Sequence, residues 1–104
     1  MQIDNITVLN AVEANTAETE FSTGKAKSVT LTCVAADSPT ATVTVYGRHT
    51  SSGSSIQLGT QAYTGTAGNH ELYFRYGGGY QYITAAVTGY SAGTITVTMA
   101  LGSE

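Results

Sequence analysis

The chain has 104 residues and a formal net charge of −3, and charged residues make up only 11% of it. A length of this order fits one domain, residues 1–104. Its four basic residues form no run, which disfavours nucleic-acid binding through clustered lysine and arginine. No stretch approaches the roughly 18 apolar residues of a membrane span, and no signal peptide opens the chain, so we expect no membrane partner and synthesis in a cytoplasm.

The first predicted segment, residues 1–24, is acidic. It contains Asp4, Glu13, Glu18 and Glu20 but no lysine or arginine. We expect one or two strands with a loop, although residues 11–20 also tolerate a helical turn. The segment forms either a solvated edge of the domain or an acidic N-terminal arm that docks on a neighbouring subunit.

From residue 29 onward, apolar residues alternate with small polar ones, which is typical of strands with one buried face. Threonine occupies many of the polar positions, and its β-branched side chain favours the same structure. The apolar sets are Val29, Leu31 and Cys33; Val43 and Val45; Leu72, Phe74 and Tyr76; Ile83, Ala85 and Val87; and Ile95, Val97, Met99 and Leu101.

Turn residues punctuate this pattern. Asp37-Ser38-Pro39 predicts a break between two strands, and glycine and serine predict loops at residues 51–55, 65–69, 77–79 and 89–93. Short strands at this spacing indicate an all-β fold. We predict a single antiparallel β-sandwich, jelly-roll-like, with about seven to nine short strands.

No residue pattern predicts catalysis or metal binding. Asp37 and Glu71 are the acids between the first twenty residues and the chain end, and neither has an obvious carboxylate partner. His49 and His70 lack the spacing of metal ligands. Cys33, the single cysteine, is expected to be a buried core thiol. We therefore predict no catalytic residue, no metal, no cofactor and no enzyme activity.

Tyrosine is the more informative side chain, with seven copies, several of them around the predicted 77–79 loop. Exposed tyrosines are typical of interfaces, whereas buried ones would form a second apolar face between packed sheets. Both interpretations are open on the sequence. The candidate interface or ligand-contact residues are Arg48, His49, Tyr73, Arg75, Tyr76, Tyr80, Tyr82 and Tyr90.

Two stretches carry a family resemblance. Residues 41–59 read ATVTVYGRHTSSGSSIQLG, and residues 80–100 read YQYITAAVTGYSAGTITVTMA. This strand, loop and hairpin pattern resembles small β-sandwich virion proteins of tailed bacteriophages, of the capsid decoration or cement type. A weaker likeness is to discoidin-like sugar-binding sandwiches, although the loop at residues 48–55 has no tryptophan.

The resemblance implies a non-enzymatic virion protein that stabilises the shell. Such a protein would form a homo-oligomer, with a trimer favoured, and would bind the major capsid protein of the same particle. It would be made in the bacterial cytoplasm and lie on the capsid exterior. The alternative function is a carbohydrate- or receptor-binding module that uses the tyrosines and the loop at residues 48–55.

Overall fold

The computed structural model describes residues 3–24, 26–76 and 79–102, and these residues form strands joined by turns. No helix in this part of the chain is long and apolar enough to span a membrane. The strands are β1 (Ile3–Val12), β2 (Thr16–Ser22), β3 (Ser28–Arg48), β4 (Ile56–Thr64), β5 (Gly68–Tyr76) and β6 (Tyr82–Gly102).

The two longest strands, β3 and β6, form the centre of the sheet. Each has 21 residues, and they pair antiparallel from Ser28 opposite Gly102 to Arg48 opposite Tyr82. β1 and β2 pair with β6 on one side, and β4 and β5 pair with β3 on the other. All six strands therefore belong to one antiparallel sheet.

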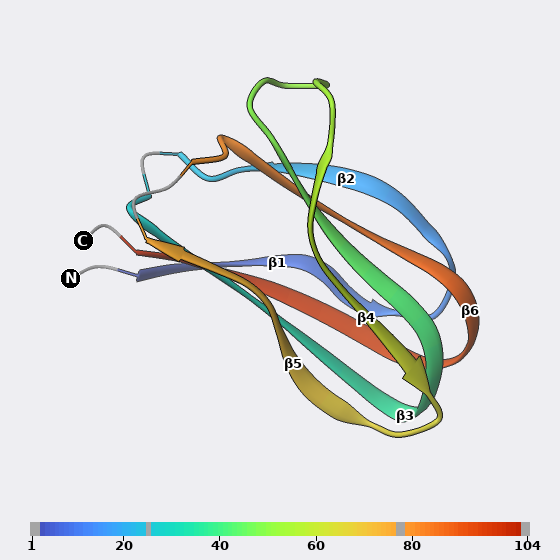
Figure 1. Cartoon of the computed structure of the whole chain (residues 1–104). Helices are drawn as coiled ribbons and strands as arrows, with labels where there is room; N and C mark the ends of the chain where they lie inside the picture. The colour runs from blue at the N-terminus through green and yellow to red at the C-terminus, as the bar shows by residue number, and fades with distance from the viewer. Residues whose placement is uncertain (1–2, 25, 77–78, 103–104) are drawn as a thin grey trace.

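Both central strands bend in the middle and divide the sheet into two arms (Figure 1). The first arm contains β1, β5, residues 28–36 of β3 and residues 94–102 of β6. The second arm contains β2, β4, residues 40–48 of β3 and residues 82–88 of β6. The start of β1 and the end of β6 lie side by side in the first arm, where Ile3 pairs with Gly102.

The bends occur where the sequence carries turn residues. Asp37 and Ser38 have φ of 61° and 53°, and Gly89 and Gly93 have φ of 60° and 92°. A Cβ on Gly93 would lie 2.5 Å from Cα of Pro39, so the two bends pack directly on each other. The predicted strand breaks at residues 37–39 and 89–93 are therefore wrong, because the strands continue through these distortions with shifted register.

Alternating side chains from both arms share one core. The alternation places one side of each central strand inward, as the sequence pattern predicts. The fully buried larger residues include Leu31, Val43, Val45, Ile83, Val87, Ile95, Val97 and Met99.

The four outer strands all contain a bulge. Register shifts occur in β1 between Thr7 and Leu9, in β2 between Thr16 and Thr19, and where β4 and β5 pair with β3. In each case the extra residue lies on the outer strand, which increases local twist. In β5 the extra residue is Leu72, which is buried, whereas Phe74 is 46% exposed. The prediction that Phe74 faces the core is therefore wrong.

Of the predicted fold class, the all-β and antiparallel character is confirmed, whereas the described strands form one bent sheet and not two separate sheets of a sandwich. The chain is all-β and antiparallel, and residues 3–22 form strands with no helical turn at 11–20. In the described part of the chain, six strands replace the expected seven to nine short ones, because β3 and β6 each continue through a bend. The loop at 51–55 is confirmed within residues 49–55, and the loop predicted at 65–69 is confined to residues 65–67. Residues 77 and 78 of the remaining predicted loop lie outside the described residues.

Candidate functional site

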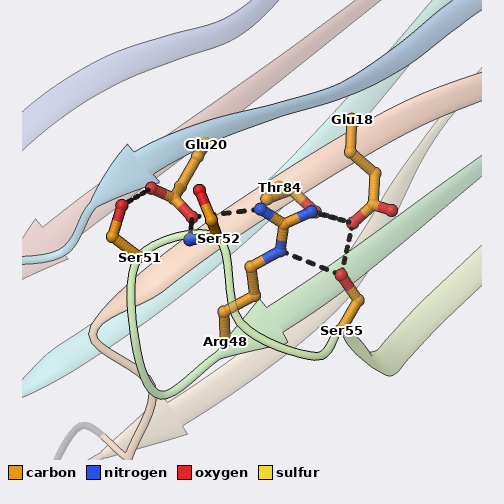
Figure 2. A network of polar contacts seen from close by, with 7 residues as sticks. All are labelled: Glu18, Glu20, Arg48, Ser51, Ser52, Ser55 and Thr84. Carbon is orange, nitrogen blue, oxygen red and sulfur yellow. Dashed lines mark hydrogen bonds and ion pairs between the residues drawn. The ribbon is translucent and has the colours of Figure 1, made fainter.

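The loop between β3 and β4, residues 49–55, is fixed by a polar network on the outer face of the second arm. Figure 2 shows Arg48, the last residue of β3, reaching between Glu18 and Glu20 of β2. Its Nη2 donates to Oε1 of Glu18 at 3.3 Å, and its Nη1 donates to Oε1 of Glu20 at 3.0 Å. Its Nε donates to Oγ of Ser55 at 2.9 Å. Each of the three guanidinium nitrogens thus donates a hydrogen bond, and the Arg48 side chain is 18% exposed.

Glu20 anchors the first half of the loop. Its carboxylate accepts hydrogen bonds from the Ser51 hydroxyl and from the Ser52 backbone N–H, each at 2.8 Å. The backbone bond from Ser52 and the bond from Ser51 outweigh desolvation and, with Arg48, lower the pKa of Glu20. Glu20 is therefore a carboxylate at neutral pH, with its acceptor oxygens occupied by the loop.

Glu18 anchors the second half of the loop and connects it to β6. Its Oε1 accepts from the Ser55 hydroxyl at 2.7 Å and from the Thr84 hydroxyl at 2.6 Å. Desolvation raises the pKa of Glu18, but the bonds from Thr84 and Ser55 and the Arg48 charge together lower it below its ordinary value. Thr84 is completely buried although it lies on the outer face, because the network covers it.

This arrangement suits a structural role better than general acid catalysis. A general acid must hold a proton near neutral pH, whereas both carboxyl groups have a lowered pKa. Among the described residues, no group of three or more His, Cys, Asp or Glu side chains gathers as metal ligands do. What the geometry achieves is a loop of defined shape on the surface of the sheet.

A small aromatic cluster lies next to the network. His49 stacks on Tyr80, with ring centroids 4.9 Å apart and an interplanar angle of 27°, and Tyr73 meets Tyr80 edge-on at 6.4 Å. Gly47 makes room for the ring, because a Cβ there would lie 2.6 Å from Cγ of Tyr80. The Tyr73 hydroxyl is buried without a hydrogen-bond partner. Tyr80 is thus held between neighbours and does not form a free stacking platform.

The structure brings five of the predicted contact residues near one another: Arg48 pairs with Tyr82, and the rings of His49 and Tyr73 both contact Tyr80. Tyr82 pairs with Arg48 across the β3–β6 ladder and is half-buried.

Tyr90 lies elsewhere, at the bend of β6. Its hydroxyl donates to the Gly93 carbonyl at 2.7 Å, and its backbone N–H donates to Oδ1 of Asn15 at 2.8 Å. Arg75 and Tyr76 belong to β5, but their side chains lie outside the described residues.

Sequence reasoning missed Glu18, Glu20 and Thr84 as partners of Arg48. The acidic character of residues 1–24 was a signal, but it did not reveal which basic residue the carboxylates meet. The carboxylates meet Arg48 because β2 and β3 both flank the start of β6. There Glu20 pairs with Thr84, and Arg48 pairs with Tyr82.

The expectation for Cys33 is confirmed, since the thiol is completely buried in the core. Tyr63 of β4 is 4% exposed and has its hydroxyl near this thiol, without hydrogen-bond geometry. Burial raises the pKa of both groups. The Tyr63 ring also meets His70 of β5 edge-on, at 5.3 Å between centroids.

The outer face of the first arm is almost uncharged. Thr7, Thr98 and Thr32 form one row across β1, β6 and β3, followed by Thr96 beside Val34. Val34 is 41% exposed. Glu71 of β5 lies opposite Thr32. It is charged, whereas the other described side chains named in these rows are not. We call this surface the threonine face.

The fold is similar to that in the crystal structure of the SPBc2 prophage-derived protein YomS. The TM-score is 0.69 at 14% sequence identity, and the match covers 96% of this chain and 92% of that one. A more distant similarity is to the structure of infectious bursal disease virus Gx strain, with a TM-score of 0.41, 11% identity, and coverage of 95% of this chain and 31% of that one. No protein-family model and no curated protein matches the sequence.

Proposed function

We propose that this chain is a non-enzymatic structural protein of a tailed-phage virion, a capsid decoration or cement protein. The observation that carries the proposal is the fold likeness to a prophage-derived protein over nearly the whole length of both chains. The sequence resemblance to phage virion proteins points the same way. In this proposal the two arms act as a small jelly-roll-like sandwich that presents its faces to neighbouring proteins.

The threonine face is the surface we assign to the major capsid protein. Docking a charged surface requires each charge to be desolvated or paired, which is costly. The threonine face avoids most of this desolvation cost, because its rows consist of threonine and Val34 and carry a charge only at their β5 end, on Glu71. A homo-oligomer, with a trimer favoured, would place several such faces on the shell at once and strengthen weak single contacts through effective concentration.

The test is co-sedimentation of the purified protein with capsids of the phage whose genome encodes it. Light scattering of the free protein measures its oligomeric state. We expect saturable binding and an oligomer. Val34→Asp should weaken capsid binding about tenfold, because it places a charge in the contact. Ser54→Asp is the matched control, because Ser54 is exposed on the loop outside the threonine face, and it should bind like the parent protein.

Two results would contradict the proposal. Absence of parent-protein binding to capsids would remove the decoration role. Binding to a glycan array instead would favour the carbohydrate- or receptor-binding module. If Val34→Asp and Ser54→Asp bind capsids equally well, the threonine face is not the contact, whereas the decoration role stands.

A further inference from the structure

The loop at residues 49–55 depends on the charges of two carboxylates. Among the described hydrogen bonds, those that join Ser51, Ser52 and Ser55 to the rest of the protein run to Glu18, Glu20 or Arg48. Within the loop, the Gly53 N–H donates to the Thr50 carbonyl at 3.0 Å. The loop therefore has no sheet ladder of its own to hold it.

The charges around this loop are few and can be named by element. β2 contributes Glu18 and Glu20, and β3 contributes Arg48. β6 contributes the uncharged Thr84 and, opposite Arg48, the titratable side chain of Tyr82. The loop contributes His49, whose ring stacks on Tyr80, and otherwise serine, threonine and glycine. Arg48 is thus the cation among the described groups that face the two carboxylates.

We propose that Glu18 and Glu20 form an acid-released latch that holds the loop at residues 49–55 against β2 and lets it open when both are protonated. Protonation removes both negative charges next to Arg48. A guanidinium with only 18% of its side chain exposed is then left without a counter-charge. Water solvates that charge better than the neutral carboxyl groups do.

Movement of Arg48 toward water moves the loop with it. Its Nε holds Ser55, and Glu20 releases Ser51 and Ser52 in the same step. Opening also uncovers Thr84, which is completely buried under the closed network. The consequence is a change in the shape and polarity of one end of the molecule while the core stays folded.

The direction of the pH effect follows from the carboxylates. Because folding lowers the pKa of both glutamates, their contribution to the closed loop is fully present above the ordinary value of 4.5. It is lost as the pH falls through the lowered pKa values. The loop is therefore closed at neutral pH and opens in acid.

The Ser52 amide is the direct reporter, because its N–H donates to Glu20. Amide hydrogen exchange followed by NMR from pH 7 down to about pH 2, corrected for intrinsic rates, should show its protection falling roughly tenfold or more once the pH has passed below the lowered pKa values of both glutamates. The Val97 amide, in the centre of β6, should stay protected.

The double variant Glu18→Gln, Glu20→Gln keeps the side-chain shapes and removes the charges. At pH 7 it should show the low Ser52 protection that the parent protein shows in acid. Glu13→Gln is the control, since Glu13 lies in the exposed turn between β1 and β2 and should leave Ser52 unchanged.

Equal Ser52 protection in the double variant and the parent protein at pH 7 would overturn the latch. So would Ser52 protection in the parent protein that persists in acid while the fold is intact. If Val97 also loses protection in acid, the whole domain is unfolding at that pH. The test of the latch is then the Ser52 protection of the double variant at pH 7. The latch is independent of capsid binding, so the two proposals can fail separately.

Discussion

Replacing Gly59 by alanine tests the contact that joins the two arms through β4 and β5. Gly59 lies in β4, which pairs with the second half of β3, and Leu72 lies in β5, which pairs with the first half. A Cβ on Gly59 would lie 1.9 Å from the Leu72 carbonyl oxygen and 2.9 Å from its carbonyl carbon. Side-chain carbons essentially never approach other atoms within 3.0 Å, so these backbones must separate by about 1 Å.

The magnitude follows from the rigidity of the obstacle. The clashing atoms are backbone, so no side-chain rotation relieves the overlap. Forcing an additional carbon into a packed site costs about 1–3 kcal/mol. For a domain of this size each kcal/mol lowers the melting temperature by about 4–8 °C. We therefore expect Gly59→Ala to lower it by about 5–20 °C.

The assay is thermal unfolding followed by circular dichroism, with Gly68→Ala as the matched control. Gly68 begins β5, and a Cβ there would meet the His70 ring at 3.5 Å, an ordinary contact. The control should melt within a few degrees of the parent protein or slightly above it. If Gly59→Ala melts like Gly68→Ala, the close approach of β4 and β5 is refuted.

Further predictions concern the ring cluster, the carboxylates and the thiol. Gly47→Ala places a Cβ 2.6 Å from the Tyr80 ring, so we expect a loss of about 1–2 kcal/mol in urea unfolding and altered NMR shifts at His49. The urea midpoint should fall as the pH drops below 4.5, because Glu18 and Glu20 have a lowered pKa in the folded protein; replacing both by glutamine should flatten this dependence. Cys33, whose pKa burial raises, should resist a thiol reagent at pH 8 until urea is added, and rapid labelling of the folded protein would contradict its position in the core.

Periodicity predicted most of the core but not the course of the strands. The alternation around Val43, Val87 and Val97 places these residues fully inside, because one sheet face is buried along both long strands. The same pattern could not show that β3 continues past Asp37 and Ser38. A turn signal and a bend inside a strand have the same local composition, and the pairing of β3 with β6 on both sides of the bend decides between them.

The site was less predictable than the core. Arg48 was a candidate from its loop, but its partners Glu18 and Glu20 lie 30 and 28 residues away in the sequence. They meet because β2 and β3 flank opposite sides of β6, which is a property of the topology and not of local sequence. Phe74 was misplaced for a related reason, since the bulge at Leu72 reverses which side chains of β5 face inward.

The bulges in the four outer strands also restrict how copies of this protein can meet. A straight exposed strand offers a regular row of N–H and C=O groups on which another chain can add, and irregular strands interrupt that row. β1, β2, β4 and β5 are each interrupted in this way. Crowded molecules would therefore gain little from growing into continuous fibrils strand by strand, and stacking through side-chain surfaces is left as the favoured mode of contact.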